Sequence, residues 1–162
     1  MTAAVQRMRG MDTSSILRLG VLGLAVLGII GTTIELVFLE HWNGLTQQIV
    51  WPSMLALVIA LALIVWRPNR ARVWTARALA VAIALVAVVG IGLHVHENVE
   101  AGPLDRHYAD NWDSLGVGQQ YWLAITGQVG PAPTLAPGAL AEISFALLLA
   151  TVHIPMARRE EG

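Results

Sequence analysis

The side chains of this chain that could bind a metal ion are carboxylates, histidines and one asparagine. Glu35, His94 and Glu142 come from distant parts of the sequence, and Glu97 and Asn98 follow His94 at spacings of three and four residues. That spacing places His94, Glu97 and Asn98 on one face of a helix. Carboxylates and imidazoles that project from facing helices form the metal centres of four-helix bundles.

The absence of cysteine restricts the metals and cofactors that these residues could hold. It excludes disulfides, iron–sulfur clusters and covalently attached haem c. The nitrogen and oxygen ligands that remain suit zinc, iron, manganese or copper(II). We therefore predict a transition-metal site whose ligands are Glu35, His94, Glu97, Asn98 and Glu142, with His41, His96 and Glu100 as a second tier.

The same residues allow two other interpretations. Glu35 and His94 could form a hydrogen-bonded pair while Glu142 bonds a backbone amide, which would make a structural polar network. They could also line a path for protons or a small ligand. The Glu-x-x-His pairs typical of di-iron bundles are missing. Nothing matches a nucleophile triad, a phosphate loop or a cofactor fingerprint, so whether the chain is an enzyme stays open.

Four long apolar stretches must position these residues, and they cover about 16–39, 49–66, 73–96 and 137–156. A bilayer core of about 30 Å needs about 20 helical residues, so each stretch is long enough to cross it. The composition agrees, with 56% hydrophobic and 13% charged residues. We predict an all-α polytopic membrane protein, an antiparallel bundle of four transmembrane helices that occupies residues 16–156.

The distribution of charge predicts the orientation of these spans. Of the ten basic residues, nine lie in segments that fall on one face of the membrane if all four stretches span it. The positive-inside rule then places the N-terminal segment 1–15 and the tail 157–162 in the cytoplasm and the loop 97–136 outside. No basic patch faces outward, so we expect no nucleic-acid partner. The expected partners are the lipid bilayer and either other membrane subunits or further copies of the chain.

Small residues indicate which helix faces pack together. Gly28 and Glu35 lie on one stripe of the first span. The stripe of the third span consists of Ala76, Ala80, Ala87, Gly90 and His94. Small residues let membrane helices approach closely, so these stripes should face the bundle interior. We expect Glu35, His94 and Glu142 to face one another there, one turn below the outer interface.

The long outer loop contains aromatic residues of the kind found at membrane surfaces. Trp112, Tyr121 and Trp122 fit the aromatic belt that anchors a segment at the lipid headgroups. A short surface helix is expected after Asn111.

Several short motifs resemble those of a known group of proteins. They are Glu35-Leu-x-x-Leu-Glu40-His41-Trp42 with Gln48 and Pro52, His94-x-x-x-Asn98-x-Glu100, Pro133-x-Leu-Ala-Pro137-Gly138 and His153-x-Pro155. This combination is similar to a set of small uncharacterised four-span bacterial integral membrane proteins. The resemblance implies the four-helix plan and a bacterial cytoplasmic (inner) membrane location. It supports Glu35, His41, His94, Asn98 and Glu100 as site positions and brings no known activity.

Three functions from different classes follow from these observations. The first is a membrane protein with an outward-facing His/carboxylate metal site at the outer end of the bundle. The second is a non-catalytic accessory subunit of a larger membrane complex. The third is a small carrier or proton-linked permease, against which the lack of a broken helix or inverted repeat argues.

Overall fold

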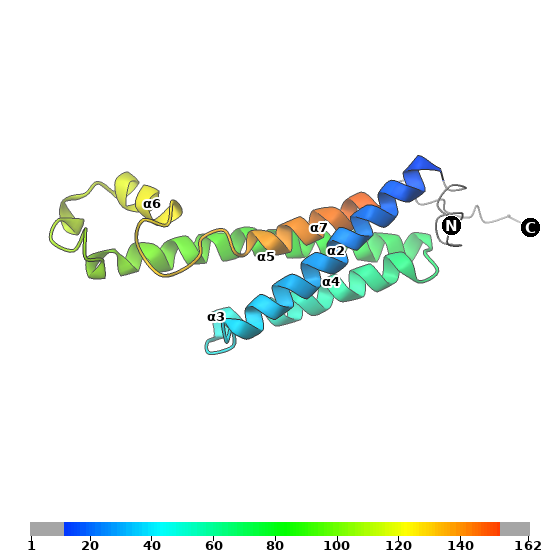
Figure 1. The fold of residues 1–162 in the computed structure, drawn as a ribbon, viewed down its shortest axis with the longest axis horizontal. Helices are drawn as coiled ribbons and strands as arrows, with labels where there is room; N and C mark the ends of the chain where they lie inside the picture. The colour runs from blue at the N-terminus through cyan, green and yellow to red at the C-terminus, as the bar shows by residue number, and fades with distance from the viewer. Residues whose placement is uncertain (1–11, 153–162) are drawn as a thin grey trace, which may run out of the picture. The chain divides into compact units, whose positions relative to one another are not determined.

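The structure is a computed structural model that describes residues 12–152, and within them every regular element is helical. The predicted N-terminal segment up to residue 11, the end of the fourth stretch, His153 and the tail lie outside the described residues. The elements are α2 (Thr13–Phe38), α3 (Leu45–Gln48), α4 (Val50–Val65), α5 (Arg70–Ala101), η1 (Gly102–Leu104), η2 (Trp112–Ser114), α6 (Val117–Ile125) and α7 (Gly138–Ala150) (Figure 1).

Three helical segments, Thr13–Phe38, Leu45–Val65 and Arg70–Leu104, are long and apolar enough to cross a membrane. The prediction of an all-helical protein is therefore confirmed for the described residues, and three of its helical segments have the length and composition of membrane spans. The fourth predicted span corresponds to α7, an apolar helix of 13 residues. That helix is about 20 Å long at 1.5 Å per residue, which is shorter than the bilayer core.

The described chain divides into two compact units. The first, called the membrane unit below, comprises the described parts of residues 1–84 and 140–162. The second, called the α6 unit, comprises Leu85–Ala139. The long helix α5 contributes its first half to the membrane unit and its second half to the α6 unit.

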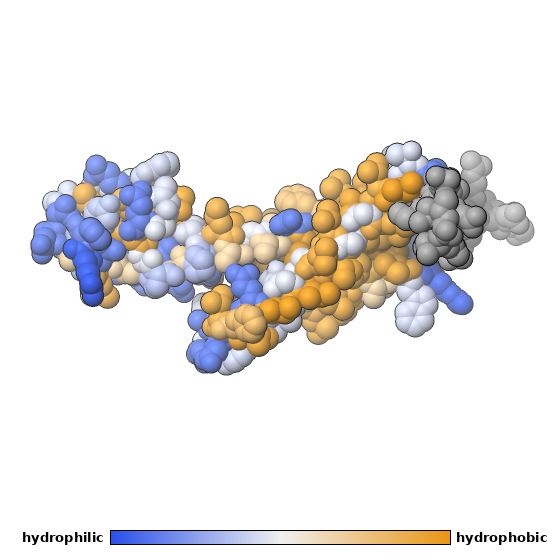
Figure 2. All heavy atoms as spheres, in the orientation of Figure 1, coloured by the Kyte–Doolittle hydropathy of each residue, from blue (hydrophilic) through white to orange (hydrophobic). Residues whose placement is uncertain are grey.

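In the membrane unit, small side chains allow the helices to pack closely. Ala76 and Ala80 of α5 are fully buried, as their positions on the small-residue stripe predicted. Gly28 of α2 lies directly under Ile143 of α7, since a Cβ atom at Gly28 would stand 2.7 Å from the Ile143 Cγ1 atom. Large apolar side chains cover the outer surface of α2 and α4, as Figure 2 shows, and this surface suits lipid contact.

In the membrane unit, two arginines donate hydrogen bonds to oxygen atoms at the C-terminal ends of helices. The Arg18 guanidinium donates hydrogen bonds to the carbonyl oxygens of Ala150 (3.1 Å) and Ile64 (3.2 Å). Arg77 donates to the hydroxyl and the carbonyl oxygen of Thr151, at 2.9 and 3.0 Å. The last carbonyls of a helix have no partner within the helix, so these contacts hold the ends of α4 and α7 at the arginine-rich ends of α2 and α5.

The turn between α2 and α4 is held by side-chain hydrogen bonds. The Trp51 indole N–H donates to the His41 carbonyl at 2.9 Å, and the Gln48 amide donates to the Trp42 carbonyl at 3.1 Å. The rings of Trp42 and Trp51 lie 6.3 Å apart. These contacts make a compact turn with two tryptophans at one end of the helix pair.

The α6 unit has a small core of its own. Val95, Trp112, Ala124 and Val129 are buried together, and Tyr108 and Leu123 are among the side chains that pack against them. Trp112 is only 5% exposed, so its predicted place in an aromatic belt is wrong. Its ring lies against Gly102, where a side chain would collide with it. The contact with a glycine, which the sequence does not reveal, turns Trp112 inward.

Candidate functional site

Asn98 is the polar centre of the α6 unit, and its side chain is fully buried. Its amide group lies within hydrogen-bonding distance of the carbonyl oxygens of Ala124 (3.3 Å) and Ala132 (2.9 Å) and of the Thr134 hydroxyl (3.2 Å). Its carbonyl oxygen accepts a hydrogen bond from the Ala132 amide at 2.9 Å. Asn98 thus joins α5, α6 and the segment before α7, and its bonding capacity is used for structure rather than for a ligand.

A glycine makes this arrangement possible. Gly130 adopts a φ of +79°, which L side chains rarely adopt, and a Cβ atom there would collide with the Asn98 backbone and side chain. Only glycine combines this backbone conformation with so close an approach.

His94 is oriented by a backbone carbonyl. Its Nδ1 atom lies 2.8 Å from the Pro133 carbonyl oxygen, which can only accept, so Nδ1 bears the hydrogen. In the neutral ring the Nε2 lone pair is then available. Histidines that ligate metals usually donate their other ring N–H in this way. The half-exposed His94 therefore has the orientation of a ligand, although the same bond also serves to hold the loop.

The second-tier residues lie at the surface. His96 and Glu100, predicted to share a helix face, form an exposed ion pair with 3.4 Å between Nε2 and Oε1. Glu97 is exposed, while Asn98 is buried, so the two residues that follow His94 do not act together. His41 is half-buried and engaged in the α2–α4 turn.

The two membrane carboxylates are exposed on the surface of this chain. The sequence pattern predicted Glu35 and Glu142 inside the bundle, and this position is not found for either. On α7 the buried face consists of Leu140, Ile143, Ser144, Leu147 and Ala150. At 100° per residue Glu142 lies opposite this face, and on α2 Glu35 is 100° away from the buried Leu36.

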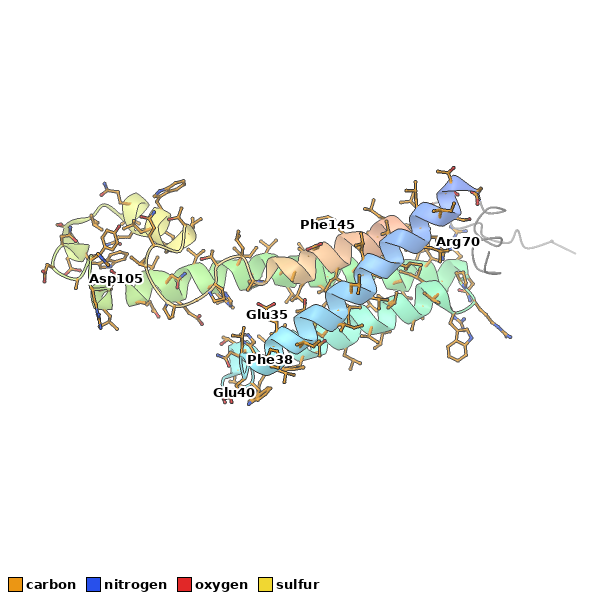
Figure 3. The ribbon with its side chains drawn as sticks, viewed as in Figure 1. Glu35, Phe38, Glu40, Arg70, Asp105 and Phe145 are labelled. Atoms are coloured by element: carbon orange, nitrogen blue, oxygen red, sulfur yellow. The ribbon has the colours of Figure 1, made fainter. Side chains whose placement is uncertain are left out.

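Glu142, Phe145 and Leu149 form one exposed stripe of α7, which the exposed Val152 continues in the turn after the helix. Phe145 is 59% exposed, and Leu149 and Val152 follow it at helical spacing, also exposed. Figure 3 shows Phe145 projecting outward from α7 and Glu35 projecting from α2. Within residues 12–152 neither the Glu35 carboxylate nor the Glu142 carboxylate makes a hydrogen bond or an ion pair. We call Glu142, Phe145, Leu149 and Val152 the α7 stripe.

The described residues contain no group of three or more His, Asp or Glu side chains that could hold a metal ion. Of the predicted ligands, Glu35 and Glu142 belong to the membrane unit and His94, Glu97 and Asn98 to the α6 unit, so the shared metal site stays a prediction. No buried side-chain nitrogen or oxygen atom in the described chain is left without a hydrogen-bond partner.

The roles of Arg18 and Arg77 escaped sequence reasoning, which counted them only as positive charges. Both lie inside apolar stretches rather than before them, at 16–39 and 73–96. An arginine within a membrane span needs a polar partner, and this position was the available signal.

Comparisons with protein families, with curated proteins and with solved structures find no match to this chain.

Proposed function

We propose that this chain is a non-catalytic accessory subunit of a larger membrane assembly and that the α7 stripe contacts the partner. The observation that supports this is the exposure of the Glu142 side chain, whose carboxylate has no hydrogen-bond or ion-pair partner within residues 12–152.

We infer the depth of Glu142 in the bilayer from two contacts within the membrane unit. Arg18 bonds the Ala150 carbonyl, and Glu142 precedes Ala150 by eight residues, or about 12 Å of helix. Ile143 lies over Gly28, which follows Arg18 by ten residues, or about 15 Å. If Arg18 marks one edge of a core of about 30 Å, Glu142 is near its middle.

A carboxylate at that depth is costly, by several kcal/mol, unless it is paired, protonated or hydrated. A helix from another subunit that presents a basic or hydrogen-bonding side chain to Glu142 would remove that cost. The apolar residues of the α7 stripe would add packing area beside the polar contact. Glu35, exposed near the end of α2, is a second position at which such a partner could bond.

Mild solubilisation followed by native mass spectrometry tests the proposal. We expect the wild-type chain in an assembly larger than a monomer, with partners either of its own kind or different. Glu142→Leu should dissociate that assembly, because the partner's polar group is left unpaired, whereas Glu97→Leu, also exposed but beyond the apolar stretch, should not. A monomeric wild type whose thermal stability rises in Glu142→Leu would refute the proposal.

The proposed orientation follows the arginines. The chain lies in a bacterial inner membrane, with both termini in the cytoplasm and residues 97–136 outside. The fourth crossing is the predicted stretch 137–156, which includes α7. Because the chain has no cysteine, single cysteines at the exposed positions Leu104 and Ala71 can report the orientation. An impermeant thiol reagent should label Leu104→Cys in intact cells and spare Ala71→Cys, and the reverse pattern would overturn the topology.

A metal bound through His94 is the second candidate, and it is favoured by the hydrogen bond from Nδ1 to the Pro133 carbonyl. Nε2 would supply one ligand, and the others would come from water or a partner. Elemental analysis of the purified protein, with His94→Ala as the control, tests this candidate.

A further inference from the structure

Helix α6 exposes its apolar side chains rather than burying them. Val117 is 68% exposed, Trp122 is 63% exposed, and Tyr121 and Ile125 are 43% and 49% exposed. At 100° per residue these four fall within an arc of about 140°. The buried Ala124 lies outside that arc, on the side that packs into the core of the α6 unit. We call Val117, Tyr121, Trp122 and Ile125 the α6 face.

The part of the α6 unit that contains helix α6 has no charged residue. Every Asp, Glu, Arg and His between residues 85 and 139 lies in the segment 94–113. The segment 114–141, which contains α6, has none. The unit therefore has a charged part suited to water and an uncharged part that exposes large apolar side chains.

Hydrogen bonds hold α6 close to the end of the apolar part of α5. The Ala124 carbonyl, near the end of α6, accepts hydrogen bonds from Asn98 (3.3 Å) and from the Thr134 hydroxyl (3.1 Å). Asn98 follows the end of the apolar stretch 73–96 by two residues, or about 3 Å along the helix. The headgroup layer on each side of a bilayer is about 5–7.5 Å thick, so this end of α6 is at its depth.

A shallow cavity enlarges the apolar surface. It has a volume of about 330 Å³ and is lined by Tyr108, Leu115, Gly118, Gln119, Trp122 and Leu123. Trp122 belongs both to this cavity and to the α6 face. The cavity therefore extends that face toward the start of the helix.

We infer that the α6 face lies in the headgroup layer of the bilayer that the chain's own helices span, and that it anchors the loop to the membrane surface. Tyrosine and tryptophan are the residues preferred at that depth, because their rings are apolar and their N–H or O–H groups can reach water. The inference depends on the membrane-spanning helices and is independent of a partner at the α7 stripe.

A protein partner fits this face less well than the bilayer does. A stable protein interface uses about 20–30 residues a side, whereas the α6 face has four large apolar side chains. The bilayer is available to every copy of the chain, because α5, whose second half belongs to the α6 unit, is itself long and apolar enough to cross it.

Site-directed spin labelling tests this inference in the full chain reconstituted in liposomes. Single cysteines at Ile125 and Val117 report on the α6 face, and Asp110→Cys, on an exposed charged position, is the matched control. We compare the collision rate of each label with oxygen to its collision rate with a water-soluble nickel chelate. The ratio of oxygen to nickel collisions should be several-fold higher for labels on the α6 face than for the label at Asp110. Unchanged thermal unfolding would show that the labelled variants fold, as expected for exposed positions.

Three results would overturn the inference. Equal ratios at Ile125, Val117 and Asp110 would mean that the face lies in water. An immobilised label with low access to both reagents would indicate a protein partner. If the low access of these labels to the nickel chelate is lost when the lipid-to-protein ratio is raised, a second copy of the chain covers the face.

Discussion

Arg77 and Thr151, 74 residues apart, are joined by two hydrogen bonds, from Nε to the Thr151 hydroxyl at 2.9 Å and from Nη2 to its carbonyl at 3.0 Å. Together with the bond from Arg18 to the Ala150 carbonyl, this contact fixes the C-terminal end of α7 against α2 and α5. A short helix of 13 residues is thereby held in the membrane unit at a terminus whose carbonyls would otherwise lack partners.

Replacing Arg77 by glutamine should destabilise the protein. The shorter amide cannot make both bonds to Thr151, and the loss should be about 1–3 kcal/mol because buried acceptors are left unpaired. Thermal unfolding in detergent measures the effect. Arg70→Gln, which removes the same charge from an exposed position at the start of α5, should change stability little. Equal unfolding temperatures for the two variants would mean that Arg77 contributes only its charge.

The helical membrane character was predictable, because it depends on apolar length alone, which the sequence states directly. The buried stripe of α5 was predictable for a related reason. Ala76, Ala80 and Ala87 recur at helical spacing and are all fully buried. Both inferences use local periodicity, which does not require knowledge of the neighbouring helices.

Gly28 and Gly31 offer a test of the contact between α2 and α7. Gly28→Ala places a methyl group against the Cγ1 atom of Ile143, whereas Gly31 has nothing within 4 Å. Alanine is favoured over glycine in a helix by about 1 kcal/mol. We therefore expect Gly31→Ala to raise the unfolding temperature and Gly28→Ala to lower it or leave it unchanged. A comparable rise in both variants would show that α7 does not pack on Gly28.

The positions of Glu35 and Glu142 could not be predicted from stripes, because the helix faces compete. On α7 the larger and more continuous apolar face, Leu140, Ile143, Ser144, Leu147 and Ala150, is the one that packs. Glu142 is left on the opposite side. Which face wins depends on the neighbouring helices, here on the fit of Ile143 over Gly28, and a single sequence does not contain that information.

Gly130 and Gly127 separate backbone strain from steric collision in the α6 unit. Both have positive φ, +79° and +68°, so alanine at either position carries a similar backbone cost of about 1–3 kcal/mol. Gly130→Ala must also displace Asn98, while Gly127 has open space around it. We expect Gly130→Ala to be much the more destabilising, measured by loss of the near-ultraviolet circular dichroism of the buried Trp112. Similar losses in the two variants would mean that the close approach to Asn98 does not matter.

Asn98 shows how one position in the sequence can suit two different roles. Its position on the His94 face was visible in the sequence, and a ligand was the predicted role. Its amide instead bonds Ala132 and Thr134, which lie more than 30 residues further along the chain. A polar side chain at the end of an apolar stripe suits a ligand or a structural bond equally well, and only the path of the loop decides between them.

Metal binding, if it occurs through His94, should depend on pH in a defined direction. A ligating imidazole must be neutral, and the Nδ1–H bond to Pro133 leaves Nε2 as the ligating atom. Bound metal should then be retained near neutral pH, lost in acid, where protons compete with the metal for the ligating nitrogen, and absent from His94→Ala at every pH. His96→Ala removes an exposed imidazole two residues away, which is paired with Glu100, and should leave the metal content unchanged. Purified wild-type protein that binds none of zinc, iron, manganese or copper after incubation at neutral pH would exclude this function and leave His94 as a residue that holds the loop against α5.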